Sequence, residues 1–378
     1  MSDKLWLFEA MDTLFFRDGS PFNAGESDSR GIKSSFPPAM ATVQGAIRTA
    51  LAVSLGWTRG SRWPEEVLGS NDNIGPLKLI GPYLALAAGR DIEFLYPFPA
   101  TVVKHKEGFA FMAPNEASVV TDLMTETQLT SGLHVEEVEN TGGLWLTTTG
   151  LEKILSGGQP AGNDWHYSGS LWHDESRIGI RLDRSTGTVV QEGGLYALTH
   201  IRPTRGLRIA VSVSGIEEKL YQSVPQTIPL GGESRMAKIS ILDAISFLPG
   251  VPVLTTEHGK VNFTVTLITP GMFAHLEADG GKGFESSREE VVKVIREGPL
   301  EGFGSCISAC IPKLSQVGGW DIANRRPRPL RPVIIPGATW FYRVAANRVD
   351  EIASLHGSQV GLDTDYGYGQ IVIGRWVS

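Results

Sequence analysis

The pattern of apolar and polar residues is clearest in the last third of the chain. In residues 261–269, Val, Phe, Val and Leu alternate with Asn and Thr, which predicts a strand with one buried face. In residues 286–296, a serine cap followed by early acidic and late basic residues predicts a helix. Four further segments predict two strands, a short helix and a final strand: 303–311, 339–345, 349–355 and 370–377. The predicted order is β-α-β-β-α-β, that of the ferredoxin-like or RRM-like unit.

A weaker pattern of the same kind runs through the first part of the chain. Residues 5–16 predict a long strand, and residues 42–55 predict an amphipathic helix that follows Pro37 and Pro38. Residues from about 60 to 200 are rich in Gly, Pro and Trp and too long for a simple loop, so we expect an insertion with its own hairpins or helices. The pattern closes with a strand, a short helix and a strand: 207–214, 216–222 and 236–242.

The two patterns are related by an offset of about 132 residues, because the paired strands begin near 207 and 339 and the short helices near 216 and 349. A tandem duplication explains this spacing. We therefore predict an α+β protein with tandem ferredoxin-like (RRM-like) domains. The first covers residues 1–250 and carries the insertion at about 60–200, and the second covers residues 251–378. In both copies a glycine-rich segment lies between the last helix and the last strand: PLGGESR and GLDTDYGYGQ.

Composition narrows the class of protein. The 44 Gly and 22 Pro among 378 residues follow no period, which excludes collagen and low-complexity linkers and indicates many loops. No run of 18 apolar residues and no signal peptide is present, so we expect a cytoplasmic protein without a membrane partner. Cys306 and Cys310 would lie roughly 13 Å apart on a strand, too far to bridge, so we expect free thiols in a reducing compartment.

The net charge of −7 argues against a uniformly basic nucleic-acid binder. The distribution of charge leaves a local basic groove possible. One alternative is that the basic runs are solvated loop faces. The two runs are NRRPRPLR, with Arg325, Arg326, Arg328 and Arg331, and HIRPTRGLR, with His200, Arg202, Arg205 and Arg208.

The last glycine-rich segment combines backbone freedom with aromatic side chains. Gly361, Gly367 and Gly369 allow positive φ and close backbone approach, so consecutive amides could point at a phosphate. Tyr366 and Tyr368 could stack on bases. The alternative is a tight turn with a β-bulge that leads into the terminal strand.

The N-terminal region resembles a known family. Residues 15–19 (FFRDG), the Pro21-Phe22 pair and Phe36-Pro37-Pro38 lead into TVQGAIRTAL at 42–51. This arrangement resembles RAMP proteins of CRISPR–Cas systems, most closely the Cas5-like RAMP subunit of the type III-B Cmr complex that pairs with the large polymerase-like subunit. Residues 230–235 and 361–369 resemble that family's internal and C-terminal glycine motifs. The resemblance covers both ends and the middle of the chain, but not residues 60–200.

The resemblance implies a non-catalytic tandem ferredoxin-like RAMP protein that needs no cofactor or metal. It implies that the chain holds the 5′ repeat-derived tag of the crRNA in a complex that acts in antiviral defence. The implied partners are the crRNA, the large polymerase-like subunit, the backbone RAMP subunits and, indirectly, the target RNA.

The residue types agree with RNA binding. Gly232 and Arg235 would place amide donors beside a guanidinium fork for a phosphate. Arg48 lies about 140° round its helix from Val43, so it could reach out of the fold or form a structural salt bridge. The predicted RNA-binding residues are Arg17, Arg30, Lys33, Arg48, Gly231, Gly232, Arg235, Lys238, Arg325, Arg326, Arg328, Tyr366, Gly367, Tyr368 and Gly369.

Two other functions remain open from the sequence. One is a metal-independent crRNA-processing endoribonuclease of the RAMP superfamily, for which His356 with Asp363, Asp365 and Tyr366 could form an acid–base set, although its place near a helix end also suits a structural role. The other is an RRM-like scaffold that binds only proteins. Further candidates are weaker: His166 and His173 match no zinc spacing, and Glu26 and Asp28 suit turn positions better than a carboxylate pair.

Overall fold

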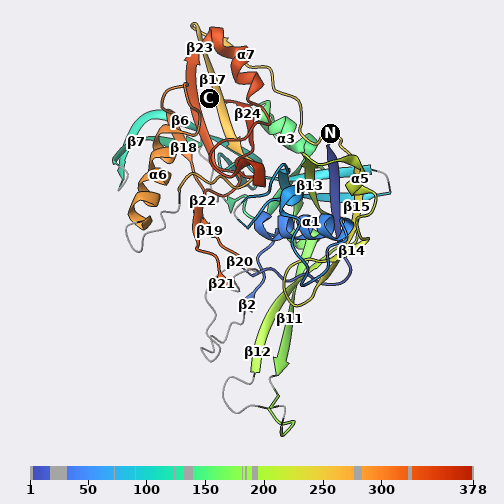
Figure 1. Ribbon diagram of the computed structural model, residues 1–378. Helices are drawn as coiled ribbons and strands as arrows, with labels where there is room; N and C mark the ends of the chain where they lie inside the picture. Colours follow the sequence, from blue (N-terminus) through green and yellow to red (C-terminus); the bar gives the residue numbers. More distant parts are fainter. Residues whose placement is uncertain are drawn as a thin grey trace. The chain divides into compact units, whose positions relative to one another are not determined.

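The computed structural model (Figure 1) divides the chain into two compact units. Unit 1 comprises Met1–Arg90, Gly169–Ala244 and Val317–Leu330, and unit 2 comprises Asp91–Ser168, Ile245–Gln316 and Arg331–Ser378. The structure describes residues 3–17, 32–71, 73–89, 91–121, 124–131, 139–180, 182–183, 185–189, 195–275, 283–321 and 326–376. The predicted domain limits, 1–250 and 251–378, stay a prediction. A large part of the predicted insertion belongs to unit 2.

The main sheet of unit 1 is antiparallel throughout. Its strands are β1 (Lys4–Ala10), β3 (Lys78–Ala88), β13 (Leu207–Ser214), β14 (Thr227–Pro229) and β15 (Met236–Asp243). Their spatial order is β3-β13-β1-β15-β14. Apart from the edge strand β14, the neighbour order is second, third, first, fourth along the chain, so β3 is the second strand of this sheet.

Two helices belong to this unit's chain order. Helix α1 (Met40–Ser54) follows β1, and its apolar positions Val43, Ile47 and Leu51 recur every four residues and are fully buried. The short helix α5 (Glu218–Tyr221) follows β13 and contacts α1. The predicted helix over 42–55 is thus confirmed, and the chain order is β1-α1-β3-β13-α5-β15.

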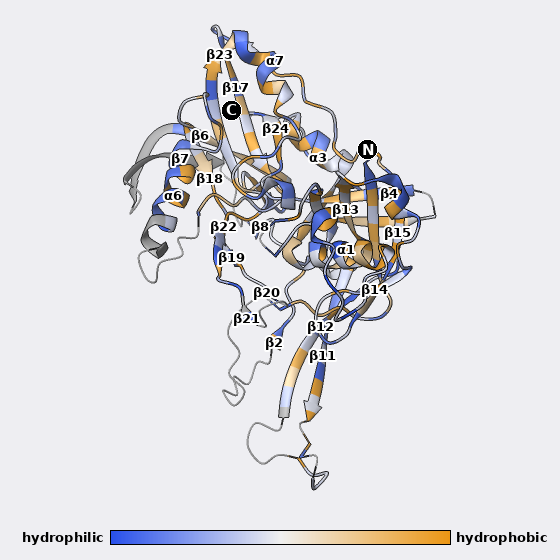
Figure 2. Cartoon of the chain, in the orientation of Figure 1, coloured by the Kyte–Doolittle hydropathy of each residue, from blue (hydrophilic) through white to orange (hydrophobic). Residues whose placement is uncertain are grey.

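A separate three-stranded sheet in unit 1 has the hairpin β11 (Trp172–Ile180) and β12 (Leu195–Pro203), with β2 (Ile32–Lys33) parallel to β12. Figure 2 shows hydrophobic residues on the outer half of this hairpin, where Ile178 and Ile180 are exposed.

The C-terminal sheet of unit 2 has the same neighbour order. Its strands are β17 (Lys260–Leu267), β18 (Ser308–Cys310), β23 (Thr339–Ala345) and β24 (Ile371–Arg375), in the spatial order β18-β23-β17-β24 and antiparallel throughout. Helix α6 (Gly283–Glu297) follows β17. The shorter elements near its ends are β16 (Thr256–Glu257), η1 (Ala346–Arg348) and α7 (Val349–Ser354).

Alternation along β17 explains why this sheet forms. Val261, Phe263, Val265 and Leu267 are fully buried and pack into one core with Trp340 of β23. The predicted strand and helix order of the C-terminal third is therefore confirmed.

The remaining part of unit 2 is rich in hairpins. Its strands are β4 (Asp91–Pro97), β5 (Val102–His105), β6 (Gly108–Thr121), β7 (Met124–Ser131), β8 (Glu139–Asn140), β9 (Leu144–Thr147) and β10 (Trp165–Tyr167), with helix α3 (Thr148–Leu155). Short elements elsewhere are α2 (Glu65–Leu68), α4 (Ser168–Leu171), β19 (Ser315–Val317), β20 (Trp320–Asp321), β21 (Arg326–Pro327), β22 (Arg331–Val333) and η2 (Thr364–Tyr366).

Two predicted strands are shorter than expected. The strand expected over 5–16 ends at Ala10, after which the chain bends and Asp12 pairs with Arg177 and Arg202 of the hairpin. The strand expected over 303–311 is confined to β18, because Gly302 and Gly304 adopt positive φ. Both cysteines are free. Among the described residues, no helix has both the length and the apolar character needed to span a membrane.

Candidate nucleic-acid interface

Three segments that are distant in sequence meet at one end of the hairpin in unit 1. Leu14, which follows β1, exchanges two backbone hydrogen bonds with Ile201 of β12. Phe15 pairs with Gly231, and its carbonyl accepts a hydrogen bond from the Gly232 amide at 2.8 Å. The glycine turn, defined as residues 230–235, is thereby fixed beside the segment after β1 and the hairpin.

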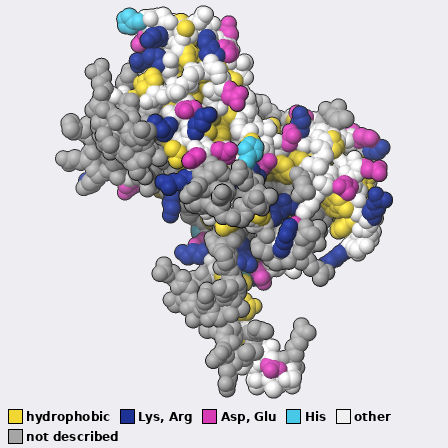
Figure 3. Space-filling view, turned by 60° about the vertical axis from the view of Figure 1, so that its left-hand side comes forward, with side chains coloured by type: hydrophobic (Ala, Val, Ile, Leu, Met, Phe, Trp, Pro, Cys, Tyr) yellow, Lys and Arg dark blue, Asp and Glu magenta, His cyan; other side chains and the backbone are white. Residues whose placement is uncertain are grey.

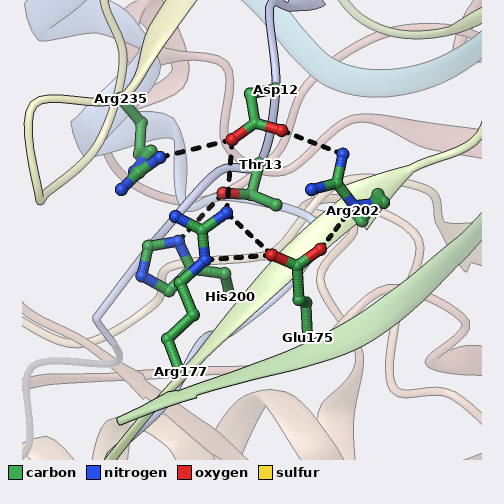
Figure 4. Close-up of polar contacts among 7 residues, drawn as sticks. All are labelled: Asp12, Thr13, Glu175, Arg177, His200, Arg202 and Arg235. Atoms are coloured by element: carbon green, nitrogen blue, oxygen red, sulfur yellow. Dashed lines mark hydrogen bonds and ion pairs between the residues drawn. The ribbon is translucent and has the colours of Figure 1, made fainter. Parts of the chain in front are cut away.

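An ion-pair network, called here the arginine network, occupies this junction (Figure 4). Asp12 lies 3.2 Å from Arg177, 2.9 Å from Arg202 and 3.5 Å from Arg235. Glu175 lies 2.7 Å from Arg177 and 2.5 Å from Arg202. Three guanidinium groups therefore share two carboxylates, which leaves one net positive charge.

Strand alternation brings these side chains together. On β11, Glu175 and Arg177 are two residues apart and point to the same face of the hairpin. On β12, His200 and Arg202 are likewise two apart, and Glu175 lies directly opposite His200. Asp12 approaches this face from the segment after β1, as Figure 4 shows.

The network holds its carboxylates ionised. Partial burial acts to raise the pKa of Asp12, but hydrogen bonds from Arg202, the Thr13 amide and Arg177 outweigh it and hold that pKa below its usual value. Hydrogen bonds from Arg202 and Arg177 lower the pKa of Glu175. Both groups stay negative at neutral pH and fix the guanidinium groups in place.

A neutral histidine lies beneath the network. Burial, followed by the positive charges of Arg177 and Arg235, lowers the pKa of His200. Its Nδ1 lies 3.0 Å from the Thr13 hydroxyl, and its ring centroid lies 5.1 Å from that of Phe15. His200 thus supports the segment that carries Asp12 without adding charge.

The arginines remain accessible. The side chains of Arg202, Arg177 and Arg235 are 45%, 34% and 24% exposed. The buried Nε of Arg235 has no hydrogen-bond partner within the described part of the chain. An anion such as a phosphate can therefore meet guanidinium donors that the protein already holds in position.

The backbone of the glycine turn is used differently from what the sequence predicted. The Gly232 amide donates to Phe15 and the Arg235 amide donates to the Gly232 carbonyl, so these amides serve the fold and not a phosphate. A Cβ at Gly231, whose φ is +85°, would lie 2.4 Å from the Phe15 carbonyl oxygen. Glu233 and Ser234 adopt φ of 53° and 52°, the pattern of a type I′ turn made without glycine.

Further predicted cations lie in the same unit. Arg17, Lys33 on β2 and Lys238 on β15 are exposed. Arg30 lies outside the described residues. On the face shown in Figure 3, basic and acidic side chains lie among one another.

Of the two roles left open for Arg48, the structure fits the structural one, with backbone carbonyls as its partners in place of a carboxylate. Its guanidinium donates to the carbonyls of Leu68, Gly69 and Ser70 at 3.0, 3.0 and 2.6 Å, and the residue is only 9% exposed. The chain at α2 covers that face of α1, which a helical-angle argument could not show. Arg48 fastens this segment to the helix.

The run of four arginines at 325–331 is divided between roles. Arg325 lies outside the described residues, and Arg326 on β21 is exposed. Arg328 donates to the backbone and side-chain oxygens of Asn71 at 3.2 and 2.9 Å. Arg331, in unit 2, forms an ion pair with Asp363.

The terminal loop, residues 361–369 of unit 2, uses backbone amides for hydrogen bonds within unit 2. The Gly367 amide donates to the Thr364 carbonyl and the Gly369 amide to the Pro270 carbonyl, both at 2.8 Å. The amides of these two glycines, predicted to hold a phosphate, therefore already have backbone partners, which fits the alternative of a tight turn.

The two tyrosines of the terminal loop differ in accessibility. Tyr368 is only 5% exposed, and burial raises the pKa of its hydroxyl to about 12. The predicted stacking of Tyr368 on a base does not fit this burial. Tyr366, on η2, is half-buried and is therefore the more accessible of the two tyrosines.

The residues considered for catalysis have other contacts. His356 has Nε2 3.0 Å from the Pro249 carbonyl, while its Nδ1 accepts from the Ile373 amide at 3.2 Å, so both nitrogens bond backbone. Glu26 and Asp28 lie outside the described residues. Within the described part of the chain, no three His, Cys, Asp or Glu side chains are grouped to hold a metal ion.

Comparison with known proteins assigns the family. The family described as "CRISPR-associated protein (Cas_Cmr3)" matches residues 6–376. This chain belongs to the Cmr3 family. The match confirms the predicted resemblance to the Cas5-like RAMP subunit of the type III-B Cmr complex. A search of curated proteins finds no match.

Solved structures agree with the fold of this Cmr3 family member. Two cryo-EM structures of the type III-B Cmr-beta, one bound to cognate target RNA and AMPPnP (state 1) and one bound to cognate target RNA, contain similar chains with TM-scores of 0.51 and 0.50. Both are 14% identical and align over 99% of this chain and 100% of theirs. A chain in the crystal structure of the Csm3-Csm4 subcomplex of the type III-A interference complex has a TM-score of 0.38 at 10% identity, over 99% and 100% of the two chains. The first two confirm a mixed α+β fold with antiparallel sheets.

Sequence reasoning missed most of the arginine network. It noted Arg202 in a basic run, but it did not connect this residue with Asp12, Glu175 or Arg177. The available signal was the two-residue spacing of charged groups, E-S-R at 175–177 and H-I-R at 200–202. That spacing puts each pair on one face of a strand.

Proposed function

We propose that this chain is a non-catalytic, crRNA-binding subunit of a type III-B Cmr complex, and that it holds the 5′ repeat tag of the crRNA. Membership in the Cmr3 family supports the assignment to the complex. The large polymerase-like subunit and the backbone RAMP subunits are its proposed protein partners, and it meets target RNA through the guide.

We propose further that the chain is a tandem ferredoxin-like protein. Both main sheets follow the neighbour order second, third, first, fourth, and both have helices after their first and third strands. Such agreement over two sheets supports duplication more strongly than the sequence offset does. The hairpin β11–β12 and the strands β4–β10 are then additions between the second and third strands of the first copy.

The arginine network is the observation that carries the RNA-binding proposal. It offers three positioned, partly exposed guanidinium groups against two carboxylates, with an unpartnered Nε on Arg235. Phosphates are recognised by such charge-assisted, forked donors. Lys33 and Lys238 extend the cationic surface in the same unit, and Tyr366 is the proposed stacking residue of unit 2.

A salt titration of tagged crRNA binding tests this proposal. For a single-stranded RNA, each phosphate contact that is removed should lower the magnitude of the slope of log affinity against log salt by about 0.7. We therefore expect the double variant Arg202→Ala/Arg235→Ala to bind more weakly, with a slope smaller by about 1.4.

The matched control is Arg208→Ala, which removes an arginine of the same unit that is paired with Glu9 at 3.0 Å. It should leave the slope unchanged. If the double variant and the control give the same slope as the wild type, the network serves only the fold and RNA lies elsewhere. Melting temperatures of all three proteins show whether the fold is kept.

A further inference from the structure

The outer edge of β15 is covered by a neighbouring strand over only part of its length. Strand β14 pairs with β15 from Met236 to Lys238, and the Ile239 amide donates to the Gln226 carbonyl at 2.8 Å. The residues that precede Gln226 connect it to α5 and form no strand beside β15. Within the described residues, no strand pairs with this edge beyond Ile239.

Along the uncovered part of the edge, the main-chain groups have no strand partner among the described residues. Successive residues of a strand direct N–H and C=O to opposite sides. The Ile239 amide points toward β14, whereas the Ala244 amide bonds to Asp3 on the opposite, β1 side. By alternation, Ile241 and Asp243 direct their N–H and C=O groups to the side that β14 leaves open.

A groove lies against this edge and is called here the edge groove. Its volume is about 340 Å³. It is bounded on one side by the end of β15 and on the other by α5 and the chain that leaves it. The lining residues are Lys4, Glu218, Tyr221, Gln222, Ile241, Leu242 and Asp243.

The edge groove carries a net negative charge. The Lys4 ammonium lies 2.7 Å from Asp243 and 2.6 Å from Glu218, so one cation faces two carboxylates. The side chain of Lys4 is 11% exposed, whereas that of Asp243 is 90% exposed. The accessible charge is therefore acidic, which disfavours a nucleic acid and favours a basic group.

We propose that the edge groove binds a short extended segment of a partner protein, which pairs with Ile241 and Asp243 and places a lysine or arginine against Asp243 and Glu218. Main-chain pairing supplies affinity in this mode of recognition, and the side-chain pocket supplies specificity. Leu242 and Tyr221 provide apolar surface for the same segment. The site lies outside the arginine network, and it relies on the proposed function only for the choice of probe.

Amide hydrogen exchange of residues 240–243 tests the proposal on the wild-type chain. The probes are the purified large polymerase-like subunit and the purified backbone RAMP subunit, each added with and without tagged crRNA. We expect the Ile241 and Asp243 amides to be protected in the assembled complex and unprotected with crRNA alone. Equal exchange in the free chain and in the complex would overturn the proposal.

A charge reversal gives the second test. Asp243→Lys places a cation beside Lys4 at an exposed position, so we expect about a tenfold or greater loss of affinity for the partner subunit. The control is Glu217→Lys, because Glu217 is exposed, pairs with Lys219 and does not line the groove. Equal effects of the two variants would also overturn the proposal.

Binding of tagged crRNA to the same variants separates the two proposals. If Asp243→Lys retains RNA affinity and also retains full assembly, the edge groove has no such partner while the RNA proposal stands. If the wild-type chain itself fails to bind tagged crRNA but residues 240–243 are protected by a protein subunit, the proposed RNA function fails and the groove stands.

Discussion

The glycine turn of unit 1 and the terminal loop of unit 2 hold corresponding places in the chain, since each lies between the last helix and the last strand of its main sheet. The charged side chains of the two segments are paired differently. Arg235 of the glycine turn pairs with Asp12 of another segment, in a network where arginines outnumber carboxylates. Asp363 of the terminal loop pairs one to one with Arg331.

The two segments also differ in how tightly they are packed. The terminal loop buries Tyr368 and receives two hydrogen bonds from the Gln359 side chain, at the carbonyls of Thr364 and Tyr368. The side chains of Glu233 and Ser234 in the glycine turn are exposed. The glycine turn thus lies beside the partly exposed arginines of the proposed RNA site, whereas the terminal loop is packed as a structural turn.

The largest expected effect comes from disrupting the packing of the terminal loop. A Cβ at Gly369, whose φ is +77°, would lie 1.8 Å from the Val360 carbonyl oxygen. Gly369→Ala should therefore lower the free energy of unfolding by about 3 kcal/mol or more, through backbone strain and steric overlap. Urea unfolding measures the loss, and any loss of RNA binding in this variant would follow from the fold.

The control for that variant is Gly302→Ala in the same unit. Gly302 has a similar φ of +75°, but a Cβ there would meet nothing within 4 Å. We expect a cost of about 1–2 kcal/mol from the left-handed conformation alone. If the two alanine variants unfold at the same urea concentration, steric overlap at Gly369 adds nothing to the cost of the left-handed conformation.

Much of this fold could be predicted because its signals are local. Two-residue alternation marks β17, consecutive aromatic residues mark β23, and four-residue spacing marks α1. Strand β3 was missed because its sequence, KLIGPYLALAA, has Gly and Pro near its start and does not alternate, and its pairing with β13 is irregular near Ala210. Its identity as the second strand depends on a pairing more than a hundred residues away.

The candidate site was less predictable for a related reason. A basic residue near a glycine turn is visible in the sequence at Arg235, but its partner Asp12 lies 223 residues earlier. The two roles left open for Arg48 could not be separated from the sequence, because a polar position on a helix looks exposed until another segment covers it. Burial and partners of charged groups are properties of the whole fold.

A smaller effect concerns the buried histidines, one in each unit. Burial lowers the pKa of His200 and of His356, and Arg177 and Arg235 lower that of His200 further. Below the ordinary histidine pKa of about 6.5, the unfolded chain therefore binds more protons than the folded one. Stability should fall as the pH falls from about 7.5 to about 5.5, by up to about 1.4 kcal/mol per pH unit for each histidine.

Urea unfolding across this pH range measures how the free energy of unfolding depends on pH. The variants His200→Gln and His356→Gln show which unit contributes to that dependence. Each variant should flatten the dependence. The lowered pKa values of Asp12 and Glu175 act in a separate window, below about pH 4, where protonation of these carboxylates removes their contribution. A wild-type stability that is constant between about pH 7.5 and 5.5 would contradict the assigned neutral histidines.

The smallest expected effect is a gain in stability at the glycine turn. Ser234 adopts a φ of 52°, which costs a non-glycine residue about 1–2 kcal/mol, whereas glycine pays mainly in the entropy of the unfolded chain. Ser234→Gly should therefore stabilise unit 1 by about 0.5 kcal/mol in urea unfolding, without changing the charge of the arginine network.

Ser223→Gly, at an exposed turn position without positive φ, should instead destabilise. In unit 2, Asp363→Gly relieves a φ of 55° but also removes the ion pair with Arg331, so its gain should be smaller or absent. If Ser234→Gly destabilises as Ser223→Gly does, the turn is unstrained, and its left-handed residues do not distinguish it from the terminal loop.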